Sequence, residues 1–505
     1  MHRRSFLAAS AAAAVSCSRP QPQVRPNILL VVADDQSWAH ASAYGSHAVQ
    51  TPHFDRVARE GVRFTHSFCA SPSCTPSRSA ILSGRHQWQQ REAGVLYGSM
   101  PPDLPLYTHL LEDSGYFTGF TGKGWGPGNF GALGLKRNPC GREYNQRKYG
   151  EAPPPGIDVR DYAANFQDFL RDRPQNTPFC FWFGSTEPHR LYDPGIGLRM
   201  GKKLTDAAVP SFLPQTDAVR SDLLDYYAEI EWFDRQLGRA LTALEATGEL
   251  DRTLVVVTSD NGMPFPRAKV NLYDWGVRMP LAIRWGDRIK GGRVANEFAS
   301  HVDFAPTFLE AAGVNAPQGM SGRSLLPLLD GKAGPARDRA FTSMERHTMC
   351  RPDGAGYPMR ALRTAEYLYI RNFAPDRWPT GGEFLSSNRT THGDIDAGPS
   401  KDEVLSARAE LCIARRPAEE LYVVADDPDQ VRNVAQDPKH SATMAKLRGD
   451  LEGYLRQTGD PRMAGQDPWK DYVYHQTTGY GASFNKSLSE EVRRQARERP
   501  THKPE

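Results

Sequence analysis

Two short apolar runs that each end in polar side chains place the strongest constraint on how this chain folds. Residues 28–33 (ILLVVA) lead into the pair Asp34-Asp35, and residues 254–259 (LVVVTS) lead into the pair Asp260-Asn261. Short continuous runs rich in β-branched residues are typical of strands buried on both faces of a parallel or mixed sheet. Because binding sites lie beyond the carboxyl ends of such strands, both polar pairs are expected to meet at one pocket.

Helical segments alternate with these strands along the chain. The spacing of apolar residues predicts helices over residues 51–61, 104–115, 161–171 and 226–248, and a further strand over residues 179–183. This alternation predicts an α/β fold with a large mixed, mostly parallel sheet sandwiched by helices.

A smaller domain is predicted after the large one. Residues 357–373, with apolar side chains at alternate positions, and residues 420–424 have the pattern of strands in an antiparallel sheet. Because 505 residues exceed what one hydrophobic core usually organises, we assign residues 25–350 to the large domain and residues 351–485 to a smaller α+β domain built on that sheet. Residues 486–505 are predicted to form a flexible tail.

The first 20 residues have the organisation of an export signal. Arg3-Arg4 precede an alanine-rich apolar run that ends at Val15. The paired arginines leave a twin-arginine signal open, and Cys17 leaves open a lipoprotein-type signal with a lipid anchor. Because no apolar run is long enough for a transmembrane span, we expect a secreted or periplasmic protein.

The overall composition sets few limits on the partner. With 39% hydrophobic and 24% charged residues the chain has the composition of a globular protein, which argues against a disordered or fibrous one. The formal net charge of +3 creates no strong field over the whole molecule. This charge neither demands nor excludes an acidic partner, so recognition of an anion must be local. We expect no nucleic acid partner.

The most informative stretch is Cys74-Thr75-Pro76-Ser77-Arg78, followed by Gly84-Arg85. Pro76 suits the first turn of a helix, so residue 74 is expected at a helix N-terminus, where free N–H groups and the helix dipole favour anions. The stretch matches the C-x-P-x-R pattern and the Gly-Arg pair of the sulfatase family, and on these residues the chain resembles that family. The resemblance implies that a separate maturation enzyme oxidises Cys74 to formylglycine. The hydrate of this aldehyde would attack sulfur and later expel sulfate by re-forming the aldehyde.

The resemblance also implies a metal site. The family's metal ligands match Asp34, Asp35, Asp260 and Asn261, with the residue derived from Cys74 beside them. Three carboxylates and one amide form an all-oxygen set that favours a hard cation such as Ca²⁺ over zinc, and Mg²⁺ is the main alternative. Such a metal would polarise a sulfate oxygen and favour ionisation of the hydrate.

Four further residues match catalytic positions of the family. Arg78 is expected to hold the hydrate, and Lys123 and Lys269 are expected to bind the sulfate group, with Arg267 as a nearby alternative to Lys269. His189 matches the general acid that protonates the leaving group, a role that suits a histidine with a pKa near neutrality.

One position departs from the family pattern. The family commonly has histidine two residues after the lysine that matches Lys123, and this chain has Trp125 there. If that histidine assists breakdown of the sulfated intermediate, then His189, a water molecule or Arg78 must replace it here, or turnover is slow.

Within the family, the chain is most similar to the heparan N-sulfatases, also called N-sulfoglucosamine sulfohydrolases. The similarity rests on residues 187–190 (EPHR), 259–266 (SDNGMPFP), 271–273 (NLY) and 357–360 (YPMR). It implies a substrate with N-sulfoglucosamine, such as a heparan-type saccharide, bound at its nonreducing end in a closed pocket. The candidate sugar contacts are Glu187, Arg190, His347 and Arg360.

Other functions are compatible with the same residues. A carbohydrate O-sulfatase, for example one that acts at the 6-O position of glucosamine, would have the same machinery. A phosphonate or phosphodiester hydrolase of the alkaline phosphatase superfamily would share the fold. A noncatalytic carbohydrate-binding protein is the third alternative, and Trp125 gives it some support.

Overall fold

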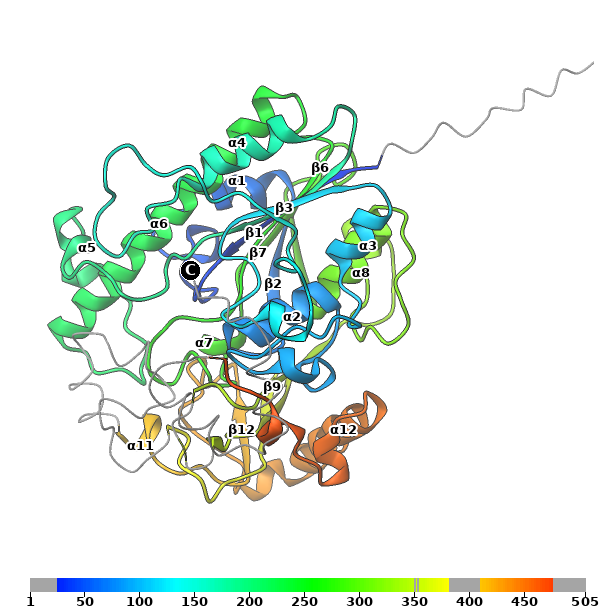
Figure 1. The fold of residues 1–505 in the computed structure, drawn as a ribbon. Coiled ribbons are helices and arrows are strands. Elements are labelled where there is room, and N and C mark those ends of the chain that lie inside the picture. The colour runs from blue at the N-terminus through cyan, green and yellow to red at the C-terminus, as the bar shows by residue number, and fades with distance from the viewer. Residues whose placement is uncertain (1–24, 349–350, 352–353, 381–408, 476–505) are drawn as a thin grey trace, which may run out of the picture.

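The computed structural model describes residues 25–348, 351, 354–380 and 409–475, which contain two separate β-sheets (Figure 1). The predicted export signal, residues 1–20, and the predicted tail, residues 486–505, lie outside the described residues. The predicted domain boundaries at residues 350 and 485 also fall outside them and stay predictions.

The large sheet has eight strands in the order β4-β3-β5-β1-β6-β7-β2-β8. Strand β7 is antiparallel to both of its neighbours, and the other strand pairs are parallel. The strands are β1 (Asn27–Ala33), β2 (Val62–Phe68), β3 (Phe117–Gly122), β4 (Arg142–Glu143), β5 (Phe179–Gly184), β6 (Thr253–Ser259), β7 (Leu281–Arg284) and β8 (Arg293–Ser300).

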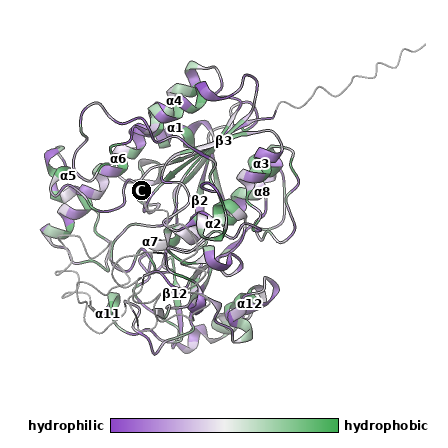
Figure 2. Ribbon diagram, viewed as in Figure 1, coloured by the Kyte–Doolittle hydropathy of each residue, from purple (hydrophilic) through white to green (hydrophobic). Residues whose placement is uncertain are grey.

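Helices cover both faces of this sheet. Figure 1 shows α1, α4 and α6 on one side of it and α2, α3 and α8 on the other. The helices are α1 (Pro52–Glu60), α2 (Cys74–Ser83), α3 (Tyr107–Asp113), α4 (Tyr162–Asp172), α5 (Ile196–Arg199), α6 (Asp217–Ala246), α7 (Asp274–Val277), α8 (Phe304–Ala311), α9 (Leu326–Leu329), α11 (Ala409–Cys412) and α12 (Ser441–Gln457). In Figure 2 the longer helices carry both hydrophobic and hydrophilic stretches, as expected for segments with one face against a sheet.

The continuous apolar run of β1 is explained by burial on both faces. Ile28, Leu30 and Val32 belong to the core beneath α2, α3 and α8, whereas Leu29 and Val31 belong to the core beneath α1, α4 and α6. Successive strand residues point to opposite faces, so a strand between two helical layers has no polar face.

The second sheet is antiparallel, with the order β12-β11-β10-β9. Its strands are β9 (Arg339–Met344), β10 (Met359–Thr364), β11 (Tyr367–Asn372) and β12 (Glu419–Val423). One face packs on α12 through Leu362, Tyr369 and Leu421, and the other packs through Leu368 and Ile370 on a core that includes residues of the large domain.

The predicted fold class is confirmed. Helix α6 begins at Asp217 and not at residue 226, because Thr216 caps its N-terminus by accepting a hydrogen bond from the Val219 backbone N–H. Strands β2, β7 and β8 were not predicted, because none of the three has a long continuous run of apolar residues. No helix within the described part of the chain is both long enough and apolar enough to cross a membrane.

Candidate active site

The two polar pairs meet because β1 and β6 are parallel neighbours in register. Ala33, the last residue of β1, lies beside Ser259, the last residue of β6. The residues that follow therefore leave the sheet at the same edge, and Asp34, Asp35, Asp260 and Asn261 are all fully buried there. Figure 1 shows these strands side by side in the middle of the sheet.

Hydrogen bonds hold the polar pairs against each other. The backbone N–H groups of Asp35 and Asn261 both donate to Asp260 Oδ1, at 3.1 and 2.8 Å. Asn261 Nδ2 donates to Asp35 Oδ1 at 2.6 Å. Asp35 itself has a φ of 74°, in the left-handed region that costs free energy for most residues and is often occupied at functional sites.

Helix α2 brings Cys74 to this cluster. The helix begins at Cys74, after the N-cap Ser73, so the predicted position of residue 74 at a helix N-terminus is what the structure has. Cys74 Sγ lies 3.6 Å from Asp34 Oδ1 and 3.3 Å from Lys123 Nζ. Burial raises the pKa of the Cys74 thiol, and the two lysines nearby, Lys123 and Lys269, do not offset this effect. An unmodified thiol here is therefore a poor nucleophile.

The donor set fits a hard cation. Ligand atoms of Asp34, Asp35 and Cys74 lie within 4.8 Å of one another. Asn261 Oδ1 is buried and accepts no hydrogen bond within the part of the chain that the structure describes. Carboxylate oxygens together with an unsatisfied amide oxygen are the donors that Ca²⁺ and Mg²⁺ take. Within the described part of the chain, the cluster of Asp34, Asp35 and Cys74 includes no histidine and no second thiol, which zinc sites usually have.

Each of the three buried carboxylates contacts a different cation. Arg78 Nε donates to Asp260 Oδ2 at 2.8 Å, and Lys269 Nζ donates to Asp35 Oδ2 at 2.7 Å. Lys123 Nζ donates to Asp34 Oδ2. The three predicted cations thus surround residue 74 and could meet the oxygens of a bound anion. Arg267, the alternative to Lys269, instead donates to the backbone carbonyl of Leu411.

The charges of this cluster displace the pKa values of two aspartates in opposite directions. Burial favours the neutral form of Asp34, but Lys123 and the other nearby cations outweigh it and hold the pKa of that carboxyl well below its usual range. Burial, followed by the charge of Asp34, raises the pKa of Asp260 to about 6, against the opposing effect of Arg78. Asp34 is therefore the more strongly anionic of the two.

His189 lies on the loop after β5 and faces the same cluster. Its Nδ1 lies 2.6 Å from the backbone carbonyl oxygen of Arg190, and because a carbonyl only accepts, Nδ1 carries the hydrogen. Nε2 then points toward Asp35, 3.9 Å from Oδ2. The side chain is 24% exposed, whereas Asp35 is buried, so His189 is the site residue on the solvent side.

The four predicted sugar contacts lie in different environments. Arg190 forms a bidentate ion pair with Asp222, at 2.7 and 2.8 Å, and is almost completely buried. Glu187 is fully buried and accepts hydrogen bonds from Ser185 Oγ and the Asp158 backbone N–H. Both side chains therefore support the loop that carries His189.

Arg360 has the surroundings of a structural residue. It is fully buried in ion pairs with Glu345, at 2.8 Å, and Asp460, at 2.6 Å, and lies over the ring of Trp469. These contacts are those of a residue that stabilises the smaller sheet, and a sugar contact by Arg360 stays a prediction. Sequence reasoning missed this because Asp460 lies 100 residues further along the chain.

His347, in contrast, does lie near the nucleophile. Its Nδ1 is 2.9 Å from Oγ of Ser73, the N-cap of α2. His347 is buried, and its partner immediately precedes Cys74. The structure therefore places it behind the nucleophile, and a sugar contact stays a prediction.

The Trp125 indole is not placed to donate a proton to a group at residue 74. Its indole is 3% exposed and belongs to the core around α2, where Nε1 donates to Ser79 Oγ at 2.8 Å. Ser79 lies one turn and more after Cys74, so the indole N–H faces the helix side and not its N-terminus.

Sequence reasoning missed two buried supporting residues. Ser77 Oγ donates to the backbone carbonyl of Asp260 at 2.5 Å and lies 3.0 Å from His301 Nδ1. Ser77 was quoted only as part of the C-x-P-x-R stretch, and no pattern around His301 distinguishes it from other histidines. Both residues tie α2 to the end of β6.

Comparisons with known proteins show which family this chain is similar to. Residues 26–314 match the family model described as Sulfatase, and residues 268–378 match the model described as N-sulphoglucosamine sulphohydrolase, C-terminal. The chain is 30% identical over 498 residues to the N-sulphoglucosamine sulphohydrolase of Homo sapiens, which covers 88% of this chain and 93% of that protein. It is 26% identical to an ulvan-active sulfatase of Formosa agariphila, over 86% of this chain and 76% of that protein.

A solved structure extends the comparison to the fold. A protein in complex with its substrate D-glucosamine-2-N,6-O-disulfate superposes with a TM-score of 0.66 at 21% identity, over 88% of this chain and 100% of that chain. At this level of identity the likeness concerns the fold.

Proposed function

Because this chain belongs to the sulfatase family, we propose that it hydrolyses the sulfate group of a sulfated glycosaminoglycan saccharide, with N-sulfoglucosamine of heparan-type chains as the substrate. The observation that carries this proposal is Cys74 at the start of α2, within contact of Asp34 and Lys123. The relative at 30% identity, which is named for action on N-sulphoglucosamine, supports the choice of sugar.

The nucleophile of this proposal is formylglycine made from Cys74. Conversion would place the hydroxyls of an aldehyde hydrate where Sγ now lies, beside Asp34 and Lys123. The hydrated aldehyde supplies a nucleophilic hydroxyl for sulfur and, by re-forming, a route for release of sulfate. The high pKa of the buried thiol supports this reading, because it disfavours direct chemistry by cysteine.

The metal of this proposal is Ca²⁺, with Mg²⁺ as the alternative. Asp34, Asp35, Asp260 and Asn261 would hold it, with residue 74 beside them. When bound, it would withdraw electrons from a sulfate oxygen and so assist attack on sulfur. Asn261 Oδ1, which is buried without a hydrogen bond in the described structure, supports this assignment.

The protein's cations would bind and orient the sulfate group. Lys123 and Lys269 lie on either side of the carboxylate cluster, and Arg78 closes it from the α2 side. Three cations around one tetrahedral anion would orient it toward residue 74 and would stabilise the charge that grows on the sulfate oxygens in the transition state.

His189 would protonate the leaving group. Its Nε2 faces the site, so a proton on Nε2 can pass to the amine nitrogen, or in an ester to the sugar oxygen, as the bond to sulfur breaks. Since the Trp125 indole N–H is engaged by Ser79, we assign to His189, or to water beside it, the proton transfer that the family commonly gives to a histidine at that position.

Export and conversion of Cys74 would both precede activity. Residues 1–20 would direct export, so that the protein acts outside the cytoplasm or in the periplasm, and Cys17 would carry a lipid if the signal is of the lipoprotein type. A formylglycine-generating enzyme would be a required partner before or during export.

The deciding experiment is an assay of inorganic sulfate release from N-, 6-O-, 3-O- and 2-O-sulfated glucosamine saccharides and from a phosphate ester. Protein whose formylglycine has been verified by mass spectrometry should release sulfate from N-sulfoglucosamine, and chelation should abolish the release until Ca²⁺ is restored. Release only from an O-sulfated sugar would show that the enzyme is an O-sulfatase and not an N-sulfatase. A preference for the phosphate ester would overturn the sulfatase proposal.

The matched variants are Cys74→Ala and Cys69→Ala. Both thiols are buried, but the Cys69 thiol donates to the backbone carbonyl of Gly276, whereas Cys74 Sγ donates to Asp34. We expect Cys74→Ala to lose all measurable turnover while its unfolding transition is retained, and Cys69→Ala to keep activity. Normal turnover by Cys74→Ala would exclude residue 74 as the nucleophile.

A further inference from the structure

Ser77 on α2 and His301, the residue after β8, form a buried hydrogen-bond chain that ends on the backbone of Asp260. Ser77 Oγ donates to the Asp260 carbonyl oxygen at 2.5 Å and lies 3.0 Å from His301 Nδ1. Both side chains are fully buried. Because a carbonyl oxygen only accepts and the Ser77 hydroxyl has a single hydrogen, His301 Nδ1 must donate to Ser77 Oγ.

The His301 ring is neutral, so the direction of this chain is fixed. Burial, followed by the positive charge of Arg78, lowers the pKa of His301 to about 3. Since Nδ1 carries the hydrogen of the neutral ring, Nε2 carries none. Nε2 is buried and makes no hydrogen bond within the part of the chain that the structure describes. The hydrogen bonds therefore run from the imidazole N–H to the hydroxyl and from the hydroxyl to the carbonyl.

The Asp260 carbonyl belongs to the peptide group that leads into Asn261. The N–H of the same peptide group donates to Asp260 Oδ1 at 2.8 Å. Because a peptide group is planar, a contact at its oxygen and another at its N–H together fix its orientation. That orientation determines where the Asn261 side chain leaves the backbone, and Asn261 Oδ1 is the buried amide oxygen that accepts no hydrogen bond among the described residues.

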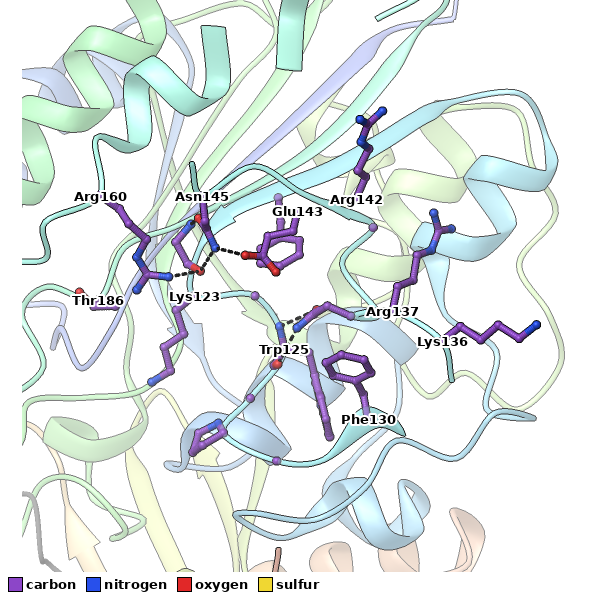
Figure 3. Close-up of a pocket in the computed structure, with 18 residues that line it drawn as sticks. Lys123, Trp125, Phe130, Lys136, Arg137, Arg142, Glu143, Asn145, Arg160 and Thr186 are labelled. Carbon is purple, nitrogen blue, oxygen red and sulfur yellow. Dashed lines mark hydrogen bonds between the residues drawn. The ribbon is translucent and has the colours of Figure 1, made fainter. Parts of the chain in front are cut away.

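Helix α2 holds Asp260 at two separate points. Arg78, the residue after Ser77, donates from Nε to Asp260 Oδ2 at 2.8 Å. Arg78 Nη1 donates to the Lys123 carbonyl at 2.7 Å, in the segment from which Lys123 and Trp125 extend to different sides in Figure 3. Arg78 thus holds the carboxylate, and Ser77 holds the peptide group. Loss of the Ser77 contact would free the peptide group while the carboxylate stays in place.

We propose that His301 and Ser77 are positioning residues of the metal site, which hold the peptide group between Asp260 and Asn261 in the orientation in which both side chains can bind the cation. The inference deepens the proposed function and rests on it, because it supposes a divalent cation at these residues. Loss of a partner that orients metal ligands commonly lowers metal affinity or activity by about 10- to 100-fold.

The first test is the Ca²⁺ dissociation constant of the full-length protein, measured by calorimetry after metal has been removed with a chelator. His301→Phe keeps a buried ring but has no N–H at the position of Nδ1, so Kd should rise about tenfold. His301→Asn places an amide N–H near the position of Nδ1 and should restore most of the affinity. His301→Gln, whose amide lies nearer the position of Nε2, should not. An unchanged Kd in His301→Phe, or equal losses in the Asn and Gln variants, would overturn the proposal.

His86→Phe and Ser83→Ala are the matched controls. His86 is buried and its pKa is lowered to about 3, as for His301, but it contacts Tyr454 of α12. Ser83 is a buried serine at the other end of α2, and its Oγ donates to the Ser79 carbonyl at 2.7 Å. Both controls should lower the free energy of unfolding and leave Kd for Ca²⁺ unchanged. A similar rise of Kd in the controls would show that the affinity follows overall stability, and would overturn the positioning role.

A double-mutant cycle tests whether the two residues act as one chain. Ser77→Ala should raise Kd for Ca²⁺ about as much as His301→Phe, roughly tenfold, because either change breaks the connection to the Asp260 carbonyl. The double variant should be no weaker than the weaker single variant, since residues of one network are not additive. Effects that multiply in the double variant would show independent actions and would overturn the chain.

The tautomer of His301 is a spectroscopic test that leaves Ser77 and its contacts intact. In protein labelled with ¹⁵N at histidine, the His301 signals are those absent from His301→Asn. At neutral pH they should show a hydrogen on Nδ1 and none on Nε2, whereas a hydrogen on Nε2 or a charged ring would overturn the chain. Neither this measurement nor Ca²⁺ binding needs turnover, so both results stand even if sulfate release fails. Failure of sulfate release with intact Ca²⁺ binding would count against the proposed function alone.

Discussion

Trp125 is the residue at which this chain departs most clearly from its family, and the structure shows what the indole does instead. It fills the core next to α2 and donates from Nε1 to Ser79 Oγ, a hydroxyl that also donates to the Thr75 carbonyl at 2.8 Å. Close packing of Gly128 against the Trp125 ring would also be lost with a smaller side chain. Trp125 is therefore a packing residue that stabilises the start of α2.

Replacement of this residue tests that role. We expect Trp125→His to lower the free energy of unfolding by about 3 kcal/mol, because it removes a large buried ring and leaves a cavity, while the protein still folds. Chemical denaturation of the variant and of Trp125→Phe, which loses the Nε1 hydrogen bond but keeps more of the ring, should give the order wild type, Phe, His. A gain in turnover without loss of stability would contradict the packing role.

Arg360 shows how a buried charge is held by its partners. Glu345 and Asp460 both contact its guanidinium, and Glu345 also receives Arg462 at 2.7 Å. A buried ion pair that loses one member leaves an uncompensated charge, which is far more costly than loss of an exposed pair.

The expected outcome for Arg360→Met is a loss of about 3 to 5 kcal/mol in unfolding free energy, with KM for the sulfated sugar unchanged in the folded fraction. Lys446→Met is the matched control, because its exposed pair with Asp450 should contribute at most about 0.5 kcal/mol. Denaturation curves and initial rates measure the two effects separately. A raised KM with unchanged stability would restore the sugar-contact assignment.

At the scale of elements, strand β9 and the segment after it support the approach to the nucleophile. The Ser343 backbone N–H donates to the Ala70 carbonyl at 3.0 Å, and Ser71 Oγ contacts Met344 Sδ. His347 continues this line of contacts to Ser73. The smaller sheet therefore packs against residues 70–73, which lead into α2. Without this sheet, the residues just before Cys74 would be exposed.

His347 is expected to act by positioning. His347→Ala should lower kcat about tenfold with KM changed less than about twofold, because Ser73 and the start of α2 lose a fixed contact while the sugar does not. His347→Asn, which keeps a polar group near Nδ1, should recover part of kcat. Steady-state kinetics decide the matter, since a sugar contact would instead raise KM and leave kcat nearly unchanged.

At the scale of the whole molecule, two buried histidines connect parts of the fold that are distant in sequence. His40 lies against Tyr226 of α6 and Trp275 of α7, and His86 stacks on Trp88 and contacts Tyr454 of α12. Burial lowers the pKa of each to about 3, and for His86 the charge of Arg360 adds to the effect.

This burial predicts a loss of stability in acid. Between pH 6.5 and about 3 the unfolded chain binds a proton at each histidine and the folded protein does not. Stability therefore falls as pH decreases through this window, by up to about 1.4 kcal/mol per pH unit for each histidine, and the full contribution is present above pH 6.5.

His86→Gln should reduce this slope by about one proton. Urea denaturation at a series of pH values measures the slope directly. Parallel curves for wild type and His86→Gln would contradict a neutral, buried His86.

The sequence by itself determined the architecture and the centre of the site. Apolar runs ending in Asp34-Asp35 and Asp260-Asn261 predicted buried strands whose ends meet at one pocket, and Cys74 followed by Pro76 predicted a helix N-terminus, because these patterns act over a few neighbouring residues. The fold class follows from the spacing of apolar residues within each strand and helix, a local pattern that repeats along the chain.

Tertiary structure alone decided which polar residues face the site. Arg190 and Arg360 have partners 32 and 100 residues away, Trp125 turns toward Ser79, and β9 meets the segment before Cys74 from the second sheet. A side chain takes the partner that burial brings to it, and burial depends on how distant elements pack. For that reason the resemblance implied a sugar contact at Arg360, and only the fold showed its ion pairs with Glu345 and Asp460.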